Sequence, residues 1–113
     1  MNSRRLFTSI QASYMSDSFG RASIIAIIYT HRKGITFRGI KRIEDRNRKR
    51  LYARISPIFH QIQKEQLEKF LEDLVHAKMV IELEGHYYLV DWLREFFDQI
   101  MARARKEQPE LFA

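Results

Sequence analysis

The chain has 113 residues, no cysteine and a net charge of +6, and 45% of its residues are hydrophobic. This length predicts one domain with a modest core. The lack of cysteine excludes disulfide bonds and thiolate metal sites, and it fits a reducing cytoplasm. The longest near-continuous apolar run, Ile24 to Tyr29, is far too short to span a bilayer, so no membrane association is expected.

The charge is unevenly distributed along the sequence. Residues 1–55 carry 13 Lys and Arg against 3 Asp and Glu, whereas residues 56–100 carry 4 against 9. A basic half favours a polyanion through counterion release, and nucleic acid in the nucleoid is the expected partner. The alternative is a solvated basic face that only balances the acidic half.

The N-terminal third predicts two helices. Apolar residues recur at helical spacing between Ser3 and Met15, although this acid-free stretch could also pass for a transit peptide. The next helix is expected from Arg21 to His31, and its isoleucines favour a central position in the core. Gly34 is expected to cap the C-terminal end of this helix. Residues 35–37 predict a short strand or the entry to the next helix.

The middle of the chain predicts basic helices. Thr36 is expected to cap a short helix marked by Phe37, Ile40 and Ile43. The charged stretch from Glu44 to Arg54 could continue this helix or form a second one. Ser56-Pro57 is typical of a helix start, which predicts a long amphipathic helix to Val75, with a break near His60 as an alternative.

After Lys78 the apolar pattern changes from helical spacing to alternation. Residues 79–90 predict a β-hairpin with a tight turn at Glu84-Gly85. Asp91 is then expected to cap a final helix to about Arg105, and residues 107–113 are expected to form a flexible tail.

The run from Gln66 to Leu89 resembles the third helix and wing of winged helix-turn-helix DNA-binding domains. The resemblance covers about Arg21 to Val90 and implies a mainly α, winged-helix-like fold with one short β-hairpin wing and flanking N- and C-terminal helices. The expected domain spans residues 1–106, with a core at 21–90. A helix after the wing resembles the dimerisation helix of many winged-helix regulators.

The expected reading helix of that family is acidic in this sequence. It carries Glu65, Glu68, Glu72 and Asp73, and the wing adds Glu82 and Glu84, all of which phosphates would repel. Nucleic-acid contact is therefore expected mainly on the Arg-rich segment between residues 32 and 54. The predicted contacts are Arg32, Lys33, Arg38, Lys41, Arg42, Arg46, Arg48, Lys49, Arg50, Arg54 and, at the helix start, Lys64.

The tail carries Gln108-Pro109-Glu110-Leu111-Phe112. This string resembles the peptide by which bacterial replication and repair proteins dock on the sliding clamp. The resemblance implies that Leu111 and Phe112 fill an apolar pocket while Gln108 hydrogen-bonds at its edge. A chance match and a tail folded onto the core are the alternatives.

No catalytic, metal or cofactor site is expected. The four histidines are scattered, and the four glycines form no phosphate-binding loop. The sequence favours a DNA-binding protein of replication or transcription control over a protein-interaction module that uses the acidic half, and over an RNA-binding module. A homodimer is expected through Trp92, Phe96, Phe97 and Ile100, unless these rings pack on the isoleucine helix.

Overall fold

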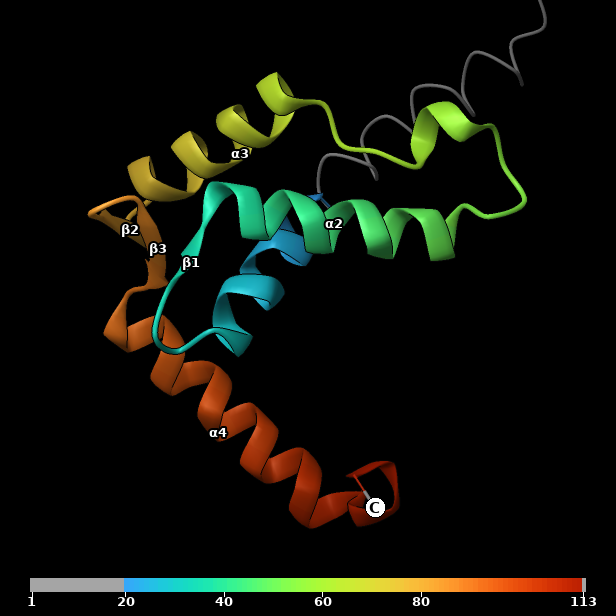
Figure 1. Cartoon of the computed structure of the whole chain (residues 1–113). Helices are drawn as coiled ribbons and strands as arrows, with labels where there is room; N and C mark the ends of the chain where they lie inside the picture. Colours follow the sequence, from blue (N-terminus) through green and yellow to red (C-terminus); the bar gives the residue numbers. More distant parts are fainter. Residues whose placement is uncertain (1–19, 113) are drawn as a thin grey trace, which may run out of the picture.

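The computed structural model describes residues 20–112, so the helix expected over Ser3 to Met15 lies outside the described residues. The described part is mainly helical with a small three-stranded antiparallel sheet (Figure 1). A helix over residues 20–30, named the first helix below, precedes the labelled elements. These are β1 (Ile35–Thr36), α2 (Phe37–Leu51), the 3₁₀ helix η1 (Pro57–Phe59), α3 (Lys64–His76), β2 (Val80–Leu83), β3 (His86–Leu89), α4 (Asp91–Glu107) and the 3₁₀ helix η2 (Pro109–Phe112).

The first helix forms the centre of the core, as its isoleucines predict. Ile24, Ile27 and Ile28 are buried in one apolar cluster with residues from α2, α3, the sheet and α4. In Figure 1 this helix lies between α2 and α4. Such a position leaves little of its circumference for solvent, which is why apolar residues cover most of it.

Gly34 belongs to the turn after the first helix rather than to the helix end. The helix stops at Thr30, and Gly34 follows a two-residue turn with a φ of +92°. A Cβ atom at Gly34 would lie 2.6 Å from a ring carbon of Tyr88, so only glycine fits here without strain. The expected helix cap is corrected: Gly34 lets the chain turn closely against β3.

The hairpin forms as predicted, but the sheet has a third strand. Glu84 and Gly85 both have positive φ, as a tight two-residue hairpin turn requires, and Leu83 pairs with His86 across it. β1 adds to the other edge of β3, which gives the strand order β1-β3-β2. A two-residue strand is too short to show the alternation of apolar and polar residues. For this reason the sequence of residues 35–37 was compatible with both a short strand and the entry to the next helix.

Both of those predictions hold at Thr36. This residue ends β1, and its side-chain oxygen accepts a hydrogen bond of 3.1 Å from the Gly39 N–H as the N-cap of α2. From there α2 runs without interruption to Leu51. The basic stretch after Glu44 is therefore the continuation of the same helix and not a second one.

The long helix expected from Ser56 is wrong in its first part. Only the three-residue η1 forms at Pro57, and α3 begins at Lys64. The break near His60 is confirmed, because the chain there folds back along α2 instead of staying helical. Asp45 stabilises this path by accepting a hydrogen bond of 2.9 Å from the Ile62 N–H, and Ile62 is buried.

The last long helix, α4, extends away from the body of the molecule (Figure 1). Val90 is its N-cap, and Asp91 lies in its first turn, where a carboxylate interacts favourably with the helix dipole. The expectation that Asp91 itself is the cap is thus off by one position. Leu93 is buried in the core, and η2 follows α4 as a short turn rather than an extended segment.

Candidate nucleic-acid interface

One face of α2 is apolar and packs on the core, which helps to fix the orientation of the helix. Phe37, Ile40 and Ile43 point inward, and Ile40 is completely buried. Residues three or four apart share a face of a helix, so the opposite edge of α2 must face solvent.

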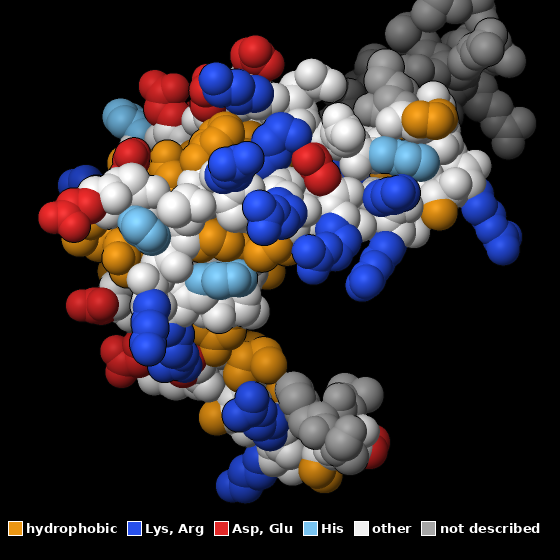
Figure 2. All heavy atoms as spheres, in the orientation of Figure 1, with side chains coloured by type: hydrophobic (Ala, Val, Ile, Leu, Met, Phe, Trp, Pro, Cys, Tyr) orange, Lys and Arg blue, Asp and Glu red, His pale blue; other side chains and the backbone are white. Residues whose placement is uncertain are grey.

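This opposite edge is cationic. Arg38, Arg42, Arg46 and Arg50 follow one another at four-residue spacing, and Lys49 lies among them; we call these five residues the cationic face. All five are exposed, and none forms an ion pair with another described residue. At a rise of about 1.5 Å per residue the row is about 18 Å long. Figure 2 shows Lys and Arg side chains gathered along α2.

Arg48 lies on a different side of α2 from the cationic face. Its Nε donates to Glu44 over 3.0 Å, and the side chains of Arg48 and Glu44 are only 11% and 4% exposed. The other oxygen of Glu44 accepts a hydrogen bond of 2.6 Å from Ser23 on the first helix. Arg48 was predicted as a nucleic-acid contact, but the structure gives its guanidinium to a buried pair that joins two helices.

Lys41 is also engaged within the protein. Its Nζ lies 2.8 Å from one oxygen of Asp45, whose other oxygen accepts from the Ile62 N–H. The acids Glu44 and Asp45, which are adjacent in sequence, therefore point to different partners and hold α2 to the first helix and to the segment before α3.

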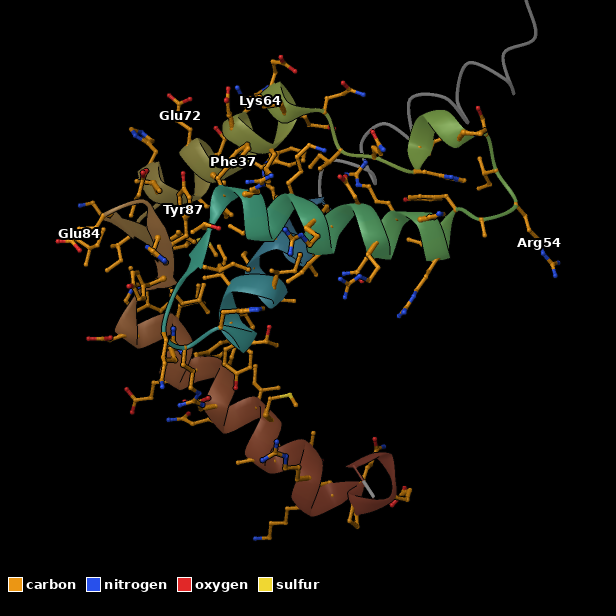
Figure 3. The ribbon with its side chains drawn as sticks, viewed as in Figure 1. Phe37, Arg54, Lys64, Glu72, Glu84 and Tyr87 are labelled. Atoms are coloured by element: carbon orange, nitrogen blue, oxygen red, sulfur yellow. The ribbon has the colours of Figure 1, made fainter. Side chains whose placement is uncertain are left out.

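The other predicted contacts are spread over the molecule. Arg32 pairs with Asp98 of α4 at 2.5 Å, and Lys33 is exposed in the neighbouring turn. Arg54 is exposed beyond the end of α2. Lys64 is the first residue of α3, and its Nζ lies 3.9 Å from Oε1 of Glu68. Arg54 and Lys64 lie far apart in Figure 3, so the eleven predicted cations do not form a single patch.

Asp98 also holds α4 to the first helix. It accepts a hydrogen bond of 2.6 Å from the Tyr29 hydroxyl, and this bond, together with burial, raises the pKa of Tyr29 above its ordinary value. Arg32 donates to the same carboxylate, so the positive charge of Arg32 is already partly neutralised by Asp98. Arg32 thus links the turn after the first helix to α4, while its side chain stays 64% exposed.

The acidic residues gather on α3 and the hairpin. Glu65, Glu68 and Glu72 are exposed on α3, and Glu82 and Glu84 are exposed on the hairpin. Figure 2 shows most red side chains over the upper left of the view, and Figure 3 places Glu72 and Glu84 at the opposite end of the molecule from Arg54. The exposed acids of α3 and the hairpin therefore belong to different elements from the cationic face of α2.

An open groove of about 370 Å³ lies on this acidic surface. Its lining consists of Glu68, Leu71, Glu72, Val75, His76, Glu82 and Tyr87. Burial, and then the nearby Glu82 carboxylate, raise the pKa of Tyr87 above its ordinary value. The groove combines an apolar floor with a negatively charged rim.

A second groove runs beside the cationic face. It has a volume of about 450 Å³ and lies between α2 and the η1 segment. Its lining consists of Asp45, Arg46, Lys49, Pro57, His60 and Gln61. The sequence pointed to Arg46 and Lys49 as possible contacts. It did not point to Pro57 or His60, because no spacing rule predicts that the chain folds back along α2.

The predicted dimer residues divide into two groups. Trp92, Phe96 and Ile100 are exposed at four-residue spacing on α4. Phe97 instead packs on Tyr29, with ring centroids 5.6 Å apart, so it belongs partly to the core.

The predicted clamp-binding residues of the tail are described only in part. Gln108 is exposed, and its N–H donates to the Ala104 carbonyl over 2.8 Å. The side chains of Leu111 and Phe112 lie outside the described part of the chain.

Within residues 20–112, no group of three or more His, Asp or Glu side chains is arranged to hold a metal ion. No described helix is both long and apolar enough to cross a lipid bilayer. Comparison with family models, curated proteins and solved structures gave no match for this chain.

The structure predicts opposite roles for two neighbouring arginines of α2. Replacing Arg48 with Ala leaves Glu44 buried without its cation, which should lower the free energy of unfolding by about 3 kcal/mol. Replacing the exposed Arg46 with Ala should change it by less than about 0.5 kcal/mol. Urea denaturation of both variants measures the difference, and equal losses would contradict the assignment of Arg48 to a structural pair.

Proposed function

We propose that this chain binds nucleic acid through the cationic face of α2. The observation that supports it most is the row formed by Arg38, Arg42, Arg46, Lys49 and Arg50, which is exposed and has no ion-pair partner in the described part of the chain. Five unpaired cations on one helix edge repel one another, and a polyanion relieves this repulsion. Arginine also forms bidentate bonds to phosphate, which suits four of the five positions.

The proposal includes a winged-helix arrangement. Its support is the order helix, strand, helix, helix, hairpin, helix, together with the strand order β1-β3-β2. In the family that the sequence resembles, the helix before the wing enters the major groove. Here that helix is α3, whose exposed Glu65, Glu68 and Glu72 disfavour such a contact. We therefore place binding on α2 and expect it to depend on backbone phosphates more than on base sequence. A role in replication or transcription control agrees with such binding.

A salt titration tests the proposal. Contact with five phosphates gives a slope of log K against log salt of about −4.5 on a duplex and about −3.5 on a single strand. The double variant Arg42→Glu/Arg46→Glu should bind at least about tenfold more weakly and reduce this slope by about 2. Fluorescence anisotropy with labelled oligonucleotides measures both quantities.

The matched control is Lys64→Glu/Lys69→Glu, which changes the net charge equally but on α3. It should bind within about twofold of the parent chain, since α3 lies outside the proposed interface. Loss of binding in both double variants would indicate an effect of net charge alone, and absence of binding by the parent chain to DNA and RNA would overturn the proposal.

A protein-interaction module remains the second candidate function. The specific observation in its favour is the acid-rimmed groove between α3 and the hairpin, whose apolar floor includes Leu71 and Val75. A basic polypeptide segment suits this surface by charge. Capture of a protein that survives nuclease treatment and is lost in Glu72→Lys would support this candidate over nucleic-acid binding, whereas capture that disappears with nuclease would not.

Two further parts of the proposal concern the C-terminal region. We infer homodimerisation through Trp92, Phe96 and Ile100, because an exposed apolar stripe on a projecting helix favours burial against a partner. Sedimentation should give a dimer at micromolar concentration and a monomer for Phe96→Ser/Ile100→Ser; a monomeric parent chain would refute it.

We also propose that the tail docks on a bacterial sliding clamp, with Gln108, Leu111 and Phe112 as the contacts. The support is the sequence pattern and the exposed position of Gln108 after α4. Binding of the full chain to purified clamp should be lost in Leu111→Ala/Phe112→Ala. Equal binding by this double variant and the parent would show that the tail is not the contact.

A further inference from the structure

The groove between α2 and the η1 segment joins the cationic face along one side. Arg46 and Lys49 belong to both, and the opposite wall is formed by Pro57, His60 and Gln61. A volume of about 450 Å³ falls in the range of 300–1,000 Å³ that is common for small-molecule sites. A chain of phosphates lying on the cationic face would therefore pass the mouth of a recess large enough for a planar ring.

The His60 ring is held in place before any ligand arrives. Its Nε2 lies 2.7 Å from the Tyr52 carbonyl oxygen, so this nitrogen carries the proton and donates it there. In the described residues Nδ1 makes no hydrogen bond and is available to a ligand. The ring is half-buried, so its orientation is fixed while part of its surface remains available.

The one acid in the groove, Asp45, is already engaged. One oxygen faces Lys41 at 2.8 Å, and the other accepts from the Ile62 N–H at 2.9 Å. The charge of Asp45 is thus offset by a cation and a backbone donor. Because Arg46 and Lys49 also line the groove, its net charge is positive. Gln61 is exposed and adds an amide that can both donate and accept.

We propose that this groove receives an unpaired nucleobase, so that the preferred ligand is single-stranded nucleic acid. This inference rests on the proposed function and names its substrate class. The imidazole of His60 offers a flat face for stacking, Gln61 offers hydrogen bonds to a base edge, and Arg46 and Lys49 hold the adjoining phosphates. A base within a duplex is stacked and paired, and it cannot enter such a groove without being extruded.

The aromatic residues beside the groove agree with this ligand. Phe59, between Pro57 and His60 in the chain, is 49% exposed and packs on Tyr52 with ring centroids 6.1 Å apart. An exposed aromatic ring that directly precedes His60 in the chain provides a second stacking surface, and stacking tolerates any base sequence. The acidic α3 and hairpin, by contrast, provide no surface suited to the groove of a duplex.

The test compares four labelled ligands of one length with the full chain at one salt concentration. They are single-stranded DNA, the same strand as a duplex, the same strand with abasic sites, and single-stranded RNA. Single-stranded DNA should bind about tenfold more tightly than the duplex and the abasic strand, because it supplies unpaired bases as well as phosphates. The RNA arm shows which sugar is preferred.

Variants of the groove wall locate the effect. His60→Ala and Gln61→Ala should each reduce the preference for intact over abasic strand by at least about fivefold, while His76→Ala on α3 should leave it unchanged. Gln61 makes no described side-chain hydrogen bond, so its variant remains informative even if His60→Ala unfolds.

The outcomes separate the two proposals. Equal binding of duplex, abasic and intact strands, or an unchanged preference in Gln61→Ala, would overturn the nucleobase site while nucleic-acid binding stands. Failure of all four ligands to bind would overturn the proposed function itself.

Discussion

The buried contact among Ser23, Glu44 and Arg48 determines what α2 presents to solvent. Glu44 accepts 2.6 Å and 3.0 Å hydrogen bonds from the other two side chains, and it is almost inaccessible to water. A carboxylate in such a place is tolerated only with its partners present. Together with the buried apolar side of α2, the contact fixes the rotation of α2 about its own axis. The exposure of the cationic face on the far side is a consequence of that rotation.

The same arrangement separates the charges of the molecule. The two acids of α2 are both engaged by other partners. Glu44 bonds to Ser23 and Arg48, and Asp45 bonds to Lys41 and the Ile62 N–H. Neither acid therefore neutralises the exposed cations of the cationic face. Of the other acids in the described part of the chain, six lie on α3 and the hairpin, where Arg21 pairs with Asp73 at 3.1 Å and the Lys64 ammonium lies 3.9 Å from the Glu68 carboxylate. A nucleic acid that approaches this protein would be attracted to α2 and repelled from α3, the reverse of what the resemblance to winged-helix domains implies.

Much of the fold follows from local patterns. The isoleucines of the first helix cover most of its circumference, which predicts its central position, and Glu84-Gly85 predicts the hairpin turn. The turn at Gly34, the pairing of β1 with β3 and the short η1 were not predictable, because each depends on contacts with distant segments. Gly34 fits against Tyr88, β1 pairs with β3, and Asp45 holds Ile62, and none of these pairings leaves a periodic signal in the sequence.

The candidate site shows the same limit. Composition identified the Arg-rich stretch, but it could not separate Arg46, which faces solvent, from Arg48, which pairs with Glu44. That distinction depends on which edge of α2 the core covers. His60 was recognised only as an isolated histidine, since its place in the groove requires the chain to fold back along α2.

We propose that the cationic face of α2 is the surface that contacts nucleic acid. Amide chemical shifts recorded by NMR during titration with a short oligonucleotide test it residue by residue. We expect the largest shifts between Arg38 and Arg50 and at His60 and Gln61. Shifts confined to α3 and the hairpin, with α2 unchanged, would contradict it.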